Sequence, residues 1–152
     1  MKVRQYAHFD VGSDVFSPED VTASLLLEPT KVSRRGSRST EPMVPRTNLW
    51  RYKARSVGCV DDLVRELVDL FEPLRSQLTT LTANGASWIG ISVMRSFDDP
   101  DGTEEDDGRS PDLPDNLVRV EGQHQLLGFH LDTELMARLV ALGCSLDFDE
   151  YG

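Results

Sequence analysis

The sequence predicts one α+β domain over residues 1–152, a two-layer fold with three helices on one face of a mixed or antiparallel sheet of about five strands. The length suits a single domain, and 39% hydrophobic with 28% charged residues is typical of a globular chain. Segments with apolar residues at every second position alternate with segments whose apolar residues recur every three or four positions. The resulting order is β-α-β-α-β-β-α-β. We expect the apolar stripes of the helices to share one face of the sheet and water to contact the other.

A strand and a helix open the chain. Apolar and polar residues alternate from Val3 to Val11, which predicts a half-buried strand. Ser17 then provides an N-cap and Pro18 occupies the first helical position, with two acidic residues directly after it. The helix is expected to end before Pro29.

A second strand is predicted after a loop. Residues 30–47 are rich in serine and proline and contain few apolar residues, so we expect them to form a loop. The strand over residues 49–55 places Trp50, Tyr52 and Ala54 on one face and Arg51, Lys53 and Arg55 on the other.

The clearest helical periodicity lies over residues 60–81. Apolar residues recur there mostly at spacings of three and four: Val60, Leu63, Val64, Leu67, Phe71, Leu74, Leu78 and Leu81. Two aspartates at positions 61 and 62 suit the positive end of the helix dipole. Pro73 lacks a backbone donor, so we expect a kink or a break near Phe71.

Residues 87–97 alternate and predict a third strand. A long polar stretch follows, and we expect residues 98–121 to form a mobile acidic insert in the domain.

The end of the chain predicts a strand, a helix and a strand. Residues 126–131 are expected to form the fourth strand. Asp132 caps the third helix, and Gly143 suits its C-terminal cap. Alternation over residues 146–149 predicts the last strand.

Two groups of segments carry a family resemblance: DVFSPEDV (14–21), LLLEPT (25–30), Arg35-Gly36 and Trp50 near the start, and FHLDTEL (129–135) with LGCSLDFD (142–149) near the end. Together with the leucine-rich helix after Asp62, their order and spacing resemble the DUF4279 family. The chain departs from the family chiefly in the acidic insert after Phe97. The resemblance implies a small bacterial α+β domain of undefined activity and brings no catalytic residues. An immunity-type role is a hypothesis.

Composition narrows the partners and the compartment. The net charge of −10 disfavours nucleic acid and anionic membranes as partners. It would favour a basic protein as partner, and solubility alone explains it equally well. The two cysteines are far apart and form no CxxC pair, which predicts reduced thiols. No apolar segment resembles a leader or a membrane span, so we expect a cytoplasmic location. No GxSxG, HExxH, P-loop or GxGxxG motif is present, and we expect no cofactor or metal.

The first candidate site is acidic. Residues 98–107 hold seven acids in ten positions, including Glu104, Glu105, Asp106 and Asp107. An EF-hand alignment on Gly102 places Phe97 at the first ligand position, and one on Gly108 ends at a proline, so both registers fail. A solvated loop is the favoured interpretation, and binding to a basic protein is the functional one.

The second candidate site is basic. Half of the Lys and Arg residues lie within positions 31–55: Lys31, Arg34, Arg35, Arg38, Arg46, Arg51, Lys53 and Arg55. Guanidinium groups in a loop can bind an anion, which is the functional interpretation. The alternative is that these positive charges only balance the negative charge of the rest of the molecule. Trp50 lies within this segment but shares a strand face with Ala54, which favours a place in the core.

Histidines offer a third site. His8 and His130 fall on the polar faces of their predicted strands, with Asp10, Asp147 and Asp149 as possible neighbours. A metal or acid–base site on the open sheet face is conceivable. A solvated surface with cross-strand charge pairs is the favoured interpretation.

Three functional hypotheses follow. The first is a non-catalytic, acidic protein-binding domain, in its concrete form an immunity-type inhibitor of a basic protein. The alternative is a regulatory domain that binds a small molecule or an anion through residues 31–55. The third is an enzyme of unknown reaction.

Overall fold

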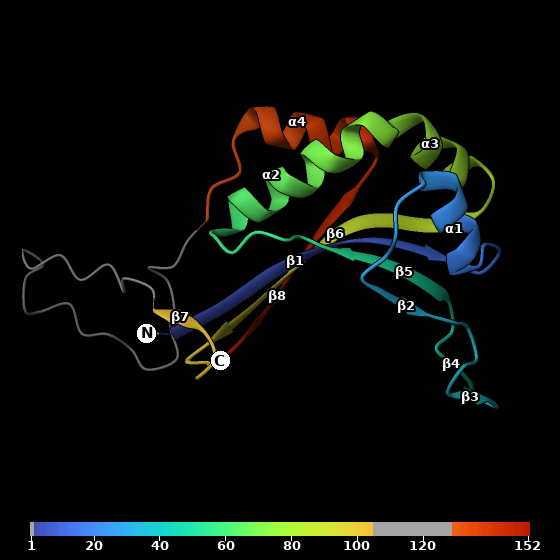
Figure 1. The fold of residues 1–152 in the computed structure, drawn as a ribbon, viewed down its shortest axis with the longest axis horizontal. Helices are drawn as coiled ribbons and strands as arrows, with labels where there is room; N and C mark the ends of the chain where they lie inside the picture. Colours follow the sequence, from blue (N-terminus) through green and yellow to red (C-terminus); the bar gives the residue numbers. More distant parts are fainter. Residues whose placement is uncertain (1, 105–128) are drawn as a thin grey trace, which may run out of the picture.

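The computed structural model describes residues 2–104 and 129–152, and all described helices lie on one side of a single large sheet (Figure 1). The helices are α1 (Pro18–Leu25), α2 (Val60–Phe71), the short 3-10 helix η1 (Glu72–Leu74), α3 (Arg75–Ala83) and α4 (Thr133–Leu142). The strands are β1 (Lys2–Ser13), β2 (Lys31–Ser33), β3 (Ser39–Thr40), β4 (Met43–Val44), β5 (Asn48–Lys53), β6 (Ala86–Phe97), β7 (Thr103–Glu104) and β8 (Ser145–Tyr151).

The large sheet is mixed and follows the order β2-β5-β1-β6-β8, with β7 pairing with β1 beyond the end of β5. β6 and β8 are parallel, and the other pairs of this sheet are antiparallel. β3 and β4 form a separate hairpin that projects away from the sheet (Figure 1). The predicted two-layer α+β fold is confirmed.

Local signals explain where the helices begin and end. The Ser17 hydroxyl accepts from the backbone N–H of Asp20, and the Asp20 carboxylate accepts from the backbone N–H of Ser17, which forms a capping box at α1. Gly143 ends α4 with φ of +69°, a left-handed conformation that glycine adopts without strain. The expected break near Phe71 is also confirmed, because η1 and Pro73 separate α2 from α3.

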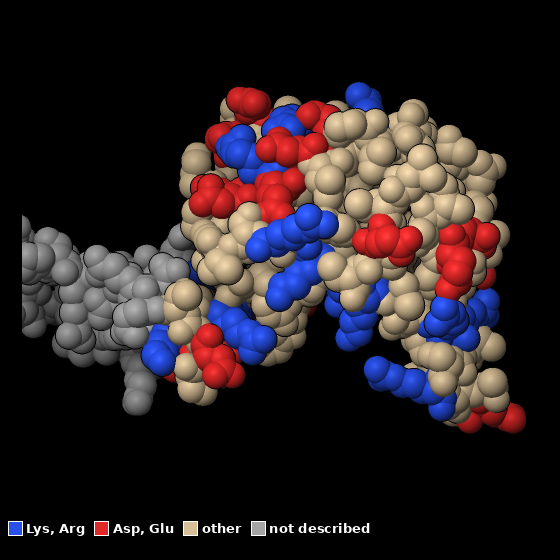
Figure 2. Space-filling model, in the orientation of Figure 1, with Lys and Arg blue, Asp and Glu red and all other residues tan. Residues whose placement is uncertain are grey.

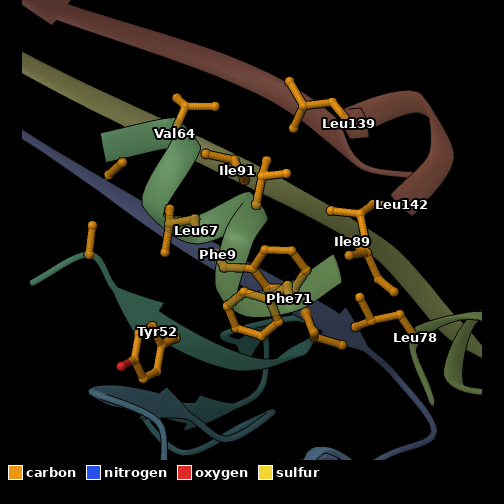
Figure 3. Packing of buried hydrophobic residues seen from close by; sticks show 14 of the residues in the cluster. Phe9, Tyr52, Val64, Leu67, Phe71, Leu78, Ile89, Ile91, Leu139 and Leu142 are labelled. Atoms are coloured by element: carbon orange, nitrogen blue, oxygen red, sulfur yellow. The ribbon is translucent and has the colours of Figure 1, made fainter. Parts of the chain in front are cut away.

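The core lies between the helices and the sheet face formed by the odd-numbered residues of β1 (Figure 3). The rings of Phe9 in β1 and Phe71 in α2 stack with centroids 3.6 Å apart. Trp50 and Tyr52 of β5 meet Phe71 edge-on. Trp50 is fully buried, and its indole N–H donates to Thr22 Oγ1 at 3.0 Å. Trp50 and Tyr52 therefore face the core, on the face of β5 that the sequence predicts.

The structure adds short strands inside two predicted loops. β2, β3 and β4 lie within residues 30–47, and β7 lies at the start of the acidic insert. β2 has three residues and β3, β4 and β7 have two each, which is too short for an alternating pattern, so the sequence predicts no strand there. β2 and β7 form because the edges of β5 and β1 offer unpaired backbone groups to them.

The fourth predicted strand is partly wrong. Residues 126–128 lie outside the described part of the chain, and residues 129–131 form no strand. β8 pairs with one edge of β6, and β1 pairs with the other edge. Along residues 90–96, β6 therefore has no free edge with which another strand could pair. Phe129 instead stacks on Phe148 of β8, with centroids 4.3 Å apart. The remainder of the predicted acidic insert, residues 105–121, is also outside the described residues.

None of the helices in the described ranges combines the length and the apolar character that a membrane crossing requires.

Candidate functional site on the open face of the sheet

The face of the sheet opposite the helices carries two cross-strand rows of polar side chains. One row runs from Lys31 on β2 through Arg51 on β5 to Asp10 on β1. The next row runs from Lys53 on β5 through His8 on β1. Register, rather than sequence proximity, brings these residues together, and we call Lys31, Arg51, Lys53, Asp10 and His8 the open-face cluster.

The cluster is built on a bidentate ion pair. Nε and Nη2 of Arg51 donate to the two carboxylate oxygens of Asp10, both at 2.7 Å. The hydroxyl of Ser92 on β6 donates to the same carboxylate at 3.1 Å. Asp10 is 0% exposed, whereas the side chain of Arg51 is 26% exposed. The buried carboxylate therefore fixes the guanidinium, while Nη1 of Arg51 has no partner among the described residues.

His8 lies beside this ion pair. Its Nδ1 is buried and has no hydrogen-bond partner among the described residues. The ring meets Tyr6 edge-on, with centroids 5.1 Å apart. The pKa of His8 is lowered to about 4, chiefly by burial and next by the positive charge of Arg51. Lys53 and Lys31 lower this pKa further, whereas the negative charge of Asp10 raises it. His8 is therefore neutral at pH 7.

The His8 pKa predicts a pH dependence of stability. Because the folded pKa of about 4 is below the ordinary histidine pKa of 6.5, the unfolded chain takes up the proton first on acidification. The contribution of neutral His8 to stability is fully present above pH 6.5 and falls as the pH drops toward about 4. We expect an NMR titration of the imidazole with a midpoint near 4. Urea unfolding of the His8→Gln variant should vary less across this window than that of the unmodified chain, and equal pH profiles would contradict the assignment.

Aromatic side chains flank the cluster on the same face. The ammonium of Lys53 lies 5.0 Å from the centre of the Tyr6 ring. At the other end, Trp88 of β6 faces Gly12 of β1. A Cβ on Gly12 would lie 2.0 Å from the indole nitrogen, so the indole packs directly on the bare backbone. The open face therefore combines cations with two partly accessible aromatic rings.

Acidic residues occupy the opposite edge of this face. Asp147 on β8 lies next to Ser92 in register, and Asp149 lies next to Met94. From β5 to β8 the face spans three strand spacings, or about 14 Å. Among the described residues, positive charge thus lies over β2 and β5, and negative charge lies over β8. His130 is exposed in the segment before α4 and joins neither row.

Arg34, Arg35 and Arg38 of the predicted basic site lie away from the open-face cluster. Arg34 forms an ion pair with Glu19 of α1. The Arg35 backbone N–H donates to the Asn48 side chain at 2.7 Å, and Arg38 lies at the base of the β3–β4 hairpin. Figure 2 shows several Lys and Arg along the lower part of the molecule, with some Asp and Glu between them, and mixed Asp, Glu, Lys and Arg over α2 and α4. Of the predicted basic residues, the structure brings Arg51 and Lys53 onto the open face, with Lys31 beside them.

The other predicted site residues lie outside this cluster. Trp50 belongs to the core. Glu104 is in β7, and Glu105, Asp106 and Asp107 lie outside the described residues.

A cysteine and two aspartates at the start of α2 form a separate group. Cys59, Asp61 and Asp62 each offer one ligand atom, all within 4.8 Å of one another. The Cys59 thiol donates to Asp62 at 2.9 Å, and this hydrogen bond raises the thiol pKa to about 11. Burial raises the pKa of Cys144 to about 12. Both thiols are therefore protonated at neutral pH, and neither resembles an activated nucleophile.

The chain matches the family model described as "Domain of unknown function (DUF4279)" over residues 2–152. It belongs to the DUF4279 family. The resemblance predicted from the sequence is confirmed, and the match includes the strands that carry the open-face cluster. Neither the curated proteins nor the solved structures contain a match to this DUF4279 chain.

Sequence reasoning missed the central part of this site. Asp10 and Lys31 were not predicted to meet Arg51, because alternation shows which face a residue occupies but not which strands pair. The one available signal was the shared polar face of His8 and Asp10 on the first strand.

Proposed function

We propose that this DUF4279 domain binds a small anionic ligand on the open face of its sheet, without catalysing a reaction. The observation that carries the proposal is the excess of positive charge in the open-face cluster. Over β2, β5 and β1, the cations Lys31, Arg51 and Lys53 are accompanied by the carboxylate of Asp10, which Arg51 already engages, whereas Asp147 and Asp149 lie over β8. Neither lysine forms an ion pair within the described part of the chain.

The chemistry of the cluster suits an anion of the carboxylate or phosphate type. A guanidinium held by a buried carboxylate is oriented before the ligand arrives, which reduces the entropy lost on binding. The two lysines add mobile ammonium donors on either side. His8 lies among these cations, so an anion bound there would favour its protonated form and raise its pKa.

The acidic-segment hypothesis remains a separate proposal. Its residues Glu105, Asp106 and Asp107 lie outside the described structure, whereas the anion-binding alternative is supported by the positions of Lys31, Arg51 and Lys53.

Inorganic phosphate and succinate are suitable probes for the test. We expect either anion to move the imidazole titration of His8 to higher pH and to bind with a measurable heat. The double variant Lys31→Ala/Lys53→Ala should weaken binding about tenfold or more, since two charge-assisted contacts are lost. Both lysines are exposed, so the melting temperature should change little.

The matched control removes the same charge from another place. Arg35→Ala/Arg38→Ala eliminates two cations near the β3–β4 hairpin and leaves the open face intact. Binding by this variant should stay within about twofold of the unmodified chain. If the hairpin variant loses binding and the lysine variant does not, the open face is not the site.

A further inference from the structure

The edge of β1 that faces β5 and β7 is interrupted. β5 pairs with residues 8–13 of β1, and β7 pairs with residues 2–3. One further hydrogen bond, from Ala54 N–H to the Ala7 carbonyl at 2.9 Å, extends the β5 side. Residues 4–6 of β1 pair with β6 on their other side, and no described strand pairs with them here.

The backbone of Gln5 points into this break. The Ala7 carbonyl faces β5, and the Val3 carbonyl faces β7, where it accepts from the Thr103 hydroxyl at 3.3 Å. In an antiparallel ladder, alternate residues direct their N–H and C=O groups to the same side. Gln5 lies midway between Val3 and Ala7, so both of its backbone groups are directed into the break.

A cavity of about 480 Å³ occupies the break, a volume within the usual range for small-ligand sites. Its lining includes Arg4, Gln5, Tyr6, Lys53, Gly58 and Asp101. The Gln5 side chain donates to the Gly58 carbonyl at 2.7 Å and holds one wall in place. At the end of the cavity near β7, a Cβ on Gly102 would lie 2.7 Å from the Val3 backbone. The backbone at Gly102 therefore packs directly on β1.

Cations line the open-face side of this cavity. Arg4 and Lys53 contribute positive charge, against the single acid Asp101. Arg4 approaches Asp99 only to 3.9 Å, so its donors remain accessible. Lys53 belongs both to the cavity and to the open-face cluster. The cavity is therefore continuous with the proposed anion site.

We propose that this cavity binds a short, extended, acidic peptide segment that supplies the strand missing between β5 and β7. One ligand residue would exchange both backbone hydrogen bonds with Gln5. Its two neighbours would then project onto the open face, opposite Arg4 and Tyr6, because side chains that face one another across a ladder share a face. Acidic side chains at these neighbours meet Arg4 and Lys53. This choice of side chain rests on the proposed anion-binding function.

The test uses the full chain and the peptide acetyl-Glu-Ala-Glu-amide, with inorganic phosphate as the comparison. We expect the peptide to bind more tightly than phosphate and to slow hydrogen exchange of the Gln5 amide, which phosphate does not do. N-methylation of the central alanine removes the donor to Gln5 and should weaken binding about tenfold. Acetyl-Ala-Glu-Ala-amide, which turns its single acid toward the helices, should bind no more tightly than phosphate.

A matched pair of protein variants locates the site. Arg4→Ala should weaken peptide binding about fivefold and leave phosphate binding unchanged, since a charge-assisted contact is lost. Lys2→Ala removes a cation from the same face of β1 but outside the cavity, so it should affect neither ligand. Peptide binding that is insensitive to N-methylation, or no tighter than phosphate binding, overturns the strand proposal and leaves the anion site standing. Failure of both peptide and phosphate to bind overturns both.

Discussion

Replacing Leu67 with aspartate is expected to unfold the domain. Leu67 lies in α2, is 0% exposed and packs within the central hydrophobic cluster (Figure 3). Burial of a leucine side chain contributes about 1.5–3 kcal/mol, and an unpaired carboxylate in its place adds a penalty of several kcal/mol more. The sum is comparable to the whole stability of an ordinary domain, about 5–15 kcal/mol. Circular dichroism should therefore show no cooperative thermal transition above 25 °C.

Val140→Asp provides the control for this variant. Val140 lies in α4 and is 79% exposed, so the same kind of substitution introduces a charge that water already solvates. Its melting temperature should change by only a few degrees. An unchanged melting temperature in Leu67→Asp would show that α2 does not pack on the sheet as described.

Loss of either partner of the Asp10–Arg51 pair is expected to be strongly destabilising, and unequally so. Arg51→Ala leaves a fully buried carboxylate with Ser92 as its remaining side-chain donor. Asp10→Ala leaves a guanidinium that is partly exposed and can reach water. Removal of one partner of a buried pair costs about 3–5 kcal/mol, and we expect Arg51→Ala near the top of this range and Asp10→Ala below it.

Urea unfolding of the two single variants and the double variant measures the pair directly. The double variant should lose less stability than the sum of the single variants, because the second substitution removes a group that the first has left without its partner. Equal losses from the two single variants would contradict the difference in burial on which the order depends. Additive losses would show that the two side chains do not interact in solution.

The anion site and the Asp10–Arg51 pair make separable predictions. We expect Lys31 and Lys53 to affect binding without supporting the fold, whereas Asp10 is expected to support the fold and to position Arg51. The Asp10→Asn variant keeps the size of the side chain and one acceptor oxygen, so it should fold and yet hold Arg51 less firmly. Weaker phosphate binding by a folded Asp10→Asn protein would then report orientation of the guanidinium rather than loss of structure.

Local residue patterns were sufficient to predict most elements of the fold. The Ser17–Asp20 capping box, the leucine periodicity of α2 and the effect of Pro73 act over a few residues, so the sequence contains the whole signal. The same holds for the faces of β1 and β5, because alternation depends only on the geometry of one strand. The polar face that carries Arg51, Lys53 and His8 was predicted in this way.

The short strands were not predictable from their own residues. β2 and β7 are polar segments that pair because β5 and β1 offer free edges, and the fourth predicted strand gives way because β8 takes the place beside β6. In each case the deciding interaction is a backbone hydrogen bond to a distant segment, which leaves no local periodicity.

The sequence alone therefore determined the helices, the long strands and the face of the sheet that each of their side chains occupies. Only the tertiary structure decided which polar residues meet. Asp10 and Arg51 are 41 positions apart and form a bidentate pair because β1 and β5 are antiparallel neighbours in one register. A register shifted by one residue would place Arg51 beside core residues instead. The open-face cluster and the break in the edge of β1 both depend on this pairing. Strand pairing brings together charged residues that are far apart in the sequence, and no local pattern in the sequence signals such long-range contacts.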